Sequence, residues 1–191
     1  RAETPEQLAR LIICLIPKRT GGTRPVALIA SCIRVLNRWL RRTYGEQWRR
    51  GNRRSFLHGT KEASPLALPW KLAAAAEYAR ATGQAAISTM LDLEKAFEKI
   101  PHGALRSAAV RYIFSLVTLR WLIAVYTTRR TIRVGRVFTK LVSATRSILP
   151  GDAFADLLLL ITIIPIMDVV AARFDNLIIG VVADDVQMMM V

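Results

Sequence analysis

Two short apolar runs, each next to a carboxylate, constrain this chain more than any other feature. Residues 85–91 follow Gly83-Gln84 and lead directly into Asp92. Asp184 and Asp185 lie between the apolar residues 177–182 and residues 186–191, which are mostly apolar. Short apolar runs bounded by turn residues are typical of strands. We therefore expect a buried strand that ends at Asp92, and a hairpin with two aspartates at its tip.

Pairing of these strands would bring Asp92, Asp184 and Asp185 together. Three carboxylates in one place repel one another unless cations lie between them. Oxygen donors suit Mg²⁺, and a pair of such ions can serve an in-line phosphoryl displacement. The alternative is structural, because Asp-Asp is common in turns and Asp92 could simply end a strand.

The residues around these acids resemble a known family. Asp-Leu-Glu-Lys-Ala-Phe-Glu-Lys-Ile-Pro-His at 92–102 and Ala-Asp-Asp at 183–185 resemble the palm of a reverse transcriptase. Leu-Ile-Pro-Lys at 15–18 and Thr-Arg-Pro-Val at 23–26 resemble the fingers motifs of the same enzymes. The likeness is to non-LTR (LINE-type) retrotransposons and, more distantly, to group II intron enzymes. It implies an RNA-directed DNA polymerase with an RNA template, a DNA primer, dNTPs and two Mg²⁺ ions, which Mn²⁺ could replace.

The resemblance also implies the fold. We expect an α+β chain with the fingers and palm of a right-hand polymerase, and an antiparallel palm sheet backed by helices. Residues 1–84 would form a basic, fingers-like region, and residues 85–191 a palm-like region with the aspartates. We expect no thumb in these residues, and we expect the chain to be a piece of a longer protein.

The acidic site takes its roles from the resemblance. Asp92 and Asp184 would bridge the two metal ions, and Asp185 would tune the site. Phe97 has the spacing of the aromatic residue that lies beneath the incoming sugar and excludes a 2′-hydroxyl. A core phenylalanine at a helix start is the simpler alternative.

The nucleotide site is implied in the same way. Lys18 and Arg24 would contact the triphosphate, a task that suits the planar arginine fork; a solvated basic turn is the alternative. Gly151 fits a place where backbone approaches a base pair closely. The resembled enzymes carry Gln before this glycine, but here the residue is Pro150, which lacks both the side-chain amide and the backbone N–H.

Charge is distributed unevenly along the chain. The formal net charge is +14, and residues 1–61 hold 14 Lys or Arg against three Glu. Residues 147–191 hold one base and six acids. The basic N-terminal region suits phosphate binding, although a solvated helix face or a patch that binds an anionic membrane would have a similar charge pattern. Residues 26–44 are predicted to form an amphipathic helix. The predicted nucleic-acid contacts are Arg34, Arg38, Arg41, Arg49 and Arg53.

The remaining features bound the cellular setting. Cys14 and Cys32 are too few for a disulfide framework, so we expect an intracellular protein of the nucleus or cytoplasm. The apolar run at 157–167 is too short to span a bilayer, so we expect a core helix and no membrane partner. The sequence gives no indication of the oligomeric state.

Other functions remain open from the sequence alone. The main alternative is a catalytically inactive retroelement remnant that still binds nucleic acid, which the loss of Gln before Gly151 favours. An RNA polymerase is disfavoured by Phe97, and a nucleotide cyclase by the lack of a Gly-rich acidic turn. A purely structural basic protein would leave the three aspartates unexplained.

Overall fold

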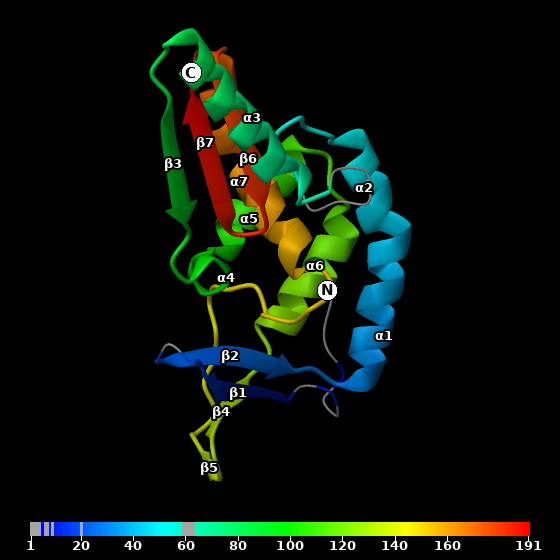
Figure 1. The fold of residues 1–191 in the computed structure, drawn as a ribbon. Helices are drawn as coiled ribbons and strands as arrows, with labels where there is room; N and C mark the ends of the chain where they lie inside the picture. Colours follow the sequence, from blue (N-terminus) through cyan, green and yellow to red (C-terminus); the bar gives the residue numbers. More distant parts are fainter. Residues whose placement is uncertain (1–4, 6–7, 9, 20, 59–63) are drawn as a thin grey trace. The chain divides into compact units, whose positions relative to one another are not determined.

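The computed structural model describes residues 5, 8, 10–19, 21–58 and 64–191. The chain forms two compact units, each built from two separate segments (Figure 1). The first unit combines Arg1–Gly51 with Lys95–Thr162, and the second combines Asn52–Glu94 with Ile163–Val191. These boundaries differ from the predicted division after residue 84, whose functional assignment stays a prediction.

The first unit contains a four-stranded sheet with the order β2-β1-β4-β5. β1 pairs with β2 in antiparallel fashion and with β4 in parallel. Side chains alternate along β1, so that Leu11 and Ile13 are buried whereas Ile16 is half exposed. The strands are β1 (Leu11–Pro17), β2 (Thr23–Leu28), β4 (Arg130–Val134) and β5 (Val137–Phe138).

Helices complete the first unit. Trp48, Phe114 and Phe154 form an aromatic cluster with edge-to-face contacts at centroid distances of 5.9 and 6.2 Å. Trp48 is buried, and so is Phe56 of the second unit, so neither ring is available for base stacking. The helical elements are α1 (Ser31–Leu40), a π-helical turn (Arg41–Gly45), α2 (Glu46–Gly51), α4 (Ala96–Lys99), α5 (His102–Arg111) and α6 (Leu116–Tyr126).

The predicted helix over residues 26–44 begins too early. Val26 belongs to β2, where it pairs with Cys14, and the helix starts only at Ser31. Backbone pairing with β1 therefore overrides the apolar spacing that the sequence suggested for these first residues.

The second unit contains a three-stranded antiparallel sheet with the order β3-β7-β6. The outer edge of β6 is extended by a parallel bridge between Leu57 and Val181. Helix α3 (Ala67–Thr82) ends at Gly83, which has a φ of 68°. The strands are β3 (Ile87–Asp92), β6 (Leu177–Val182) and β7 (Asp185–Met190), as the hairpin prediction required.

The prediction that the strand before Asp92 is buried is wrong. β3 is exposed along its whole length, with Ile87 at 69% and Met90 at 67% of full exposure. It lies at the edge of its sheet and pairs with β7 alone. Because an apolar run does not say how many neighbours a strand has, the sequence could not separate an edge strand from a central one.

Helix α7 (Ala155–Arg173) contributes residues to both units. By length and composition it is the one helix in the described ranges that could cross a membrane. Half of its apolar window is buried within the fold, and Leu158, Ile161 and Ile164 are fully buried. The predicted run of 157–167 underestimated this length, because the helix extends from Ala155 to Arg173. A buried core helix meets the same criteria of length and composition, so the expected core helix remains compatible with the structure.

Candidate active site

The candidate site lies at one end of the three-stranded sheet of the second unit. Asp92 is the last residue of β3, Asp185 is the first residue of β7, and the two are register partners. Residues directly opposite each other in an antiparallel pair have their side chains on the same face, with Cβ atoms about 4.5–5.5 Å apart. Both residues are exposed. The predicted convergence of Asp92 with the hairpin tip is therefore confirmed for Asp185.

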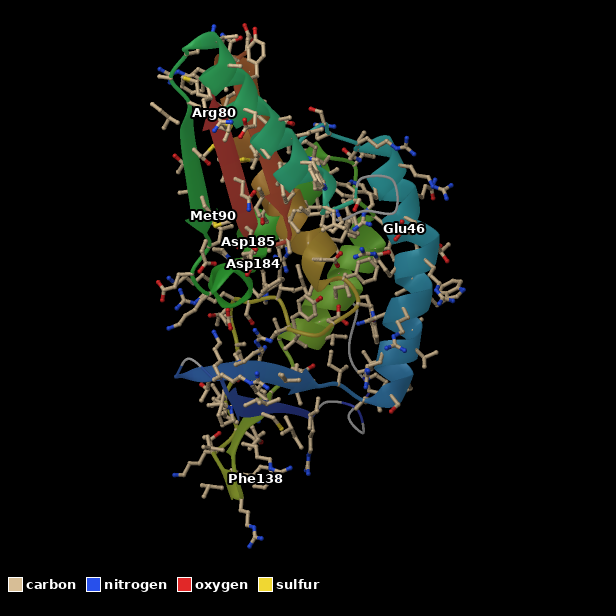
Figure 2. All side chains as sticks on the ribbon, in the orientation of Figure 1. Glu46, Arg80, Met90, Phe138, Asp184 and Asp185 are labelled. Carbon is tan, nitrogen blue, oxygen red and sulfur yellow. The ribbon has the colours of Figure 1, made fainter. Side chains whose placement is uncertain are left out.

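Asp184 lies in the two-residue turn that joins β6 to β7. Figure 2 shows Asp184 and Asp185 together at this end of the hairpin. The turn is closed by the pairing of Val182 with Asp185, and its first residue, Ala183, has a φ of 54°. This left-handed conformation is uncommon for alanine and typical of tight hairpin turns. Register places the acids, since a slip of one residue would move Asp185 to the opposite face.

The carboxylates do not by themselves form a complete metal-binding group. Among the described residues, no three His, Cys, Asp or Glu side chains come together as a group that could hold a metal ion. The oxygen donors of Asp92 and Asp185, on one face of the sheet, do fit the donor chemistry of Mg²⁺. Participation of Asp184 as the third ligand stays a prediction.

Close helix packing supports the hairpin that carries two of these acids. A Cβ atom built on Gly180 of β6 would lie 2.2 Å from both Cδ atoms of Leu68 on α3. Leu68 is buried with 1% exposure, so it has no room to move away. Glycine at this position lets α3 approach the strand three residues before the turn.

Lys18 and Arg24 lie at the turn between β1 and β2. The turn is held by a hydrogen bond from the Lys18 N–H to the Gly22 carbonyl, at 3.1 Å, and Gly21 and Gly22 both have positive φ. Both cationic side chains are exposed and make no ion pair within the described ranges. The positions leave both groups accessible to an anion, and their predicted role in triphosphate binding stays a prediction.

Backbone hydrogen bonds connect the remaining nucleotide-binding candidates within the first unit. The Ala27 N–H of β2 donates to the Pro150 carbonyl at 3.3 Å, and the Ile148 N–H donates to the Phe97 carbonyl at 2.7 Å. Gly151 has a φ of 90° and no atom within 4 Å of a built Cβ. The segment before Gly151 is therefore bonded both to the strand that carries Arg24 and to the helix that carries Phe97.

A buried polar network holds Asp152, the residue after Gly151, which was not among the predicted site residues. Asp152 accepts hydrogen bonds from Asn37 Nδ2 at 2.6 Å and from the Tyr126 hydroxyl at 2.7 Å, and Trp121 Nε1 donates to Asn37 Oδ1 at 2.9 Å. Burial, followed by the Asp152 charge, raises the pKa of Tyr126 well above its ordinary value, so the hydroxyl keeps its proton. In the sequence, the only feature that could have singled out Asp152 is its position between Pro150-Gly151 and an apolar run.

The five predicted nucleic-acid arginines fall into different environments. Arg41 makes a two-pronged ion pair with Asp156, at 2.8 Å for each prong, and Arg49 contacts the same carboxylate at 3.3 Å. Burial alone would raise the pKa of Asp156, but the hydrogen bonds and charge of Arg41, together with the Leu157 N–H and the Arg49 charge, lower the pKa below its ordinary value. Arg34, Arg38 and Arg53 are exposed. Arg41 and Arg49 therefore stabilise the fold, and their role toward nucleic acid stays a prediction.

No protein-family model and no curated protein sequence matches the chain. Solved structures of telomerase do match its fold. Telomerase from Candida tropicalis in complex with a fragment of telomeric RNA has a TM-score of 0.67 at 9% identity, covering 98% of this chain and 37% of that one. The apo telomerase of the same organism, truncated from its C-terminal domain, has a TM-score of 0.61 at 11% identity, covering 100% and 45%. Candida albicans telomerase with telomeric RNA gives 0.60 at 10% identity, covering 98% and 39%.

This chain therefore spans less than half the length of these telomerase chains. At this identity the likeness establishes the fold alone. The chain has the mixed α/β fold of the corresponding part of telomerase, a polymerase related to the reverse transcriptases.

Proposed function

We propose that this chain is the fingers-and-palm part of an RNA-directed DNA polymerase from a retroelement of the non-LTR kind. The observation that supports this best is the register pairing of Asp92 with Asp185, beside Asp184, on a chain with the telomerase fold. Carboxylates brought together on adjacent strands are costly without a cation, because like charges directly opposite each other destabilise a sheet.

In this proposal Asp92, Asp184 and Asp185 hold Mg²⁺. When bound there, the metal would supply Lewis-acid chemistry for activating the primer 3′-hydroxyl and for stabilising the charge on the pyrophosphate leaving group. Ionised aspartates present only acceptor oxygens, which are the kind of ligand atom that Mg²⁺ requires.

The nucleotide is bound by groups of the first unit. Lys18 and Arg24 neutralise the triphosphate, and the absence of a side chain at Gly151 lets the backbone approach the base pair. Phe97 fills the space that a 2′-hydroxyl would need, which selects deoxynucleotides. Replacement of Phe97 by Val or Ala should therefore increase ribonucleotide incorporation by an active chain.

A second function, nucleic-acid binding without turnover, is favoured by Pro150. The resembled enzymes have Gln at this place, and Pro150 offers the nucleotide neither an amide side chain nor a backbone N–H. Its carbonyl is bonded to Ala27, so this segment still has a defined place in the fold.

Primer extension on an RNA template with dNTPs and Mg²⁺ tests these functions. The chains compared are the parent, Asp184→Asn, Pro150→Gln, and the control Asp175→Asn, which removes an exposed carboxylate of the same unit outside the site. We expect extension by the parent and by Asp175→Asn, and none by Asp184→Asn.

The other outcomes separate the alternatives. Extension by Pro150→Gln alone would identify an enzyme that has lost nucleotide positioning but keeps its aspartate site. Undiminished extension by Asp184→Asn would refute the metal site. If no variant extends the primer but all bind RNA, the inactive remnant is the correct function.

A further inference from the structure

The outer face of α1 and of the π-helical turn after it combines exposed aromatic and cationic side chains. Val35 is 67% exposed, Trp39 56% and Tyr44 41%. They occur beside three exposed arginines of the same helical segment. We call this surface the α1 face, and it consists of Arg34, Val35, Arg38, Trp39, Arg42 and Tyr44.

The π-helical turn brings the two aromatic rings together. Its signature is the hydrogen bond from the Glu46 N–H to the Arg41 carbonyl, five residues earlier. In a regular α-helix, residues five apart point about 140° away from each other around the axis. Here the rings of Trp39 and Tyr44 meet edge to face with centroids 6.4 Å apart. The wider turn therefore builds an exposed aromatic pair that a regular helix would have separated.

The arginines of the α1 face form a row with unneutralised charge. Arg34, Arg38 and Arg42 follow at intervals of four residues, which in a helix corresponds to about 6 Å along the axis per step. None of the three makes an ion pair within the described ranges. Arg41 differs from them, because it lies on the buried side of the same segment and forms an ion pair with Asp156. The sequence contains no Asp or Glu between Gln7 and Gly45.

We propose that the α1 face binds single-stranded RNA, with bases stacked on Trp39 and Tyr44 and phosphates held by the arginine row. A row of cations along exposed rings complements a chain that alternates phosphates with planar bases. Stacking requires unpaired bases, because a duplex presents only its backbone and groove edges to such a surface. A protein partner would need a row of acids to match the three arginines.

The proposal adds a surface to the proposed function and depends on it only in the choice of RNA over DNA. None of its residues belongs to the aspartate site or to the nucleotide-binding candidates. Arg34 and Arg38 were predicted from the sequence to contact nucleic acid, whereas the stacking pair comes from the structure.

The test is a binding titration that needs no catalysis. Fluorescence anisotropy of a labelled oligouridylate of about 16 nucleotides is measured with the whole chain in EDTA, so that the aspartates hold no metal. Trp39→Ala should weaken binding about 5- to 150-fold, which is the range for loss of one stacking residue. Trp39→Phe should retain most of the affinity.

Two further variants make the result specific. Trp70→Ala removes a tryptophan of α3 that is even more exposed, at 76%, and should leave the affinity unchanged. Arg38→Gln should reduce the slope of log K against log salt by about 0.7, the value for one phosphate contact on a single strand. Duplex RNA should show no dependence on Trp39.

Several results would overturn the proposal. These are equal affinity of Trp39→Ala and the parent, an equal loss in Trp70→Ala, or tighter binding of single-stranded DNA than of RNA. Equal affinity of Trp39→Ala and the parent would favour a protein partner for this face. Primer extension separates the two proposals: an active polymerase with Trp39-independent RNA binding refutes this one alone, and an inactive chain with Trp39-dependent binding refutes only the polymerase.

Discussion

Replacement of Gly45 by alanine tests whether the π-helical turn depends on a missing side chain. Helix propensity alone predicts that Gly45→Ala is stabilising, by about 0.8–1 kcal/mol. The structure predicts the opposite. A Cβ atom on Gly45 would lie 2.6 Å from Cδ of Arg41 and 3.2 Å from Cδ2 of Leu157.

The expected loss follows from what holds these two neighbours. Leu157 is fully buried, and Arg41 is fixed at its far end by the two-pronged pair with Asp156. Overpacking of such a site costs about 1–3 kcal/mol. Displacement of Arg41 from Asp156 adds about 1 kcal/mol to this loss of stability. The figure is kept this small because the Asp156 side chain is 47% exposed, so that solvent weakens the ion pair. After subtraction of the propensity gain, the free energy of unfolding should fall by about 1–3 kcal/mol.

Urea unfolding, followed by circular dichroism, measures this change. Gly51→Ala is the matched control, because Gly51 ends α2 of the same unit and has nothing within 4 Å of a built Cβ. It should be as stable as the parent or more stable by up to about 1 kcal/mol. Gly45→Ala at or above the parent's stability would refute the reasoning from close packing.

Three further predictions concern single positions. Ile113 follows α5 with a φ of 53° and 89% exposure, so Ile113→Gly should raise the free energy of unfolding by about 1–2 kcal/mol in urea melts; no gain would contradict the backbone-strain argument. Gly180→Ala should lower the free energy of unfolding by about 1–3 kcal/mol, because its Cβ would collide with Leu68. The loss should be smaller in a Leu68→Ala background, and strict additivity in that double-mutant cycle would contradict the contact between residues 180 and 68. The folded-state pKa of Asp156 lies below its unfolded value, so its contribution to stability is present above about pH 4 and is lost as the pH falls through the lower, folded-state pKa. Asp156→Asn should flatten the stability–pH curve in this acidic range, and an unchanged slope would show that other acids dominate.

Local patterns explain what the sequence predicted well. The β6–β7 hairpin depends on two apolar runs and the polar turn between them, so its position and register follow from nearby residues. The end of α3 is equally local, because Gly83 adopts the left-handed conformation that glycine allows at low cost.

Contacts between distant residues explain what the sequence could not predict. Asp152 receives hydrogen bonds from Asn37 and Tyr126, which lie 115 and 26 residues away along the chain. The distinction between Arg41, which is bound to Asp156, and its exposed neighbour Arg42 is of the same kind. No spacing rule separates two consecutive arginines when the partner of one of them is far along the chain.

The discontinuity of the two units affects how this chain must fold as it leaves the ribosome. β3 is synthesised about 100 residues before β7, its only partner in the sheet. At ordinary rates of synthesis this interval is roughly 5 to 20 seconds. During that time an apolar strand with two free edges can pair with other chains. β7 therefore both completes the carboxylate pair and covers one of the two edges through which β3 could pair with other chains.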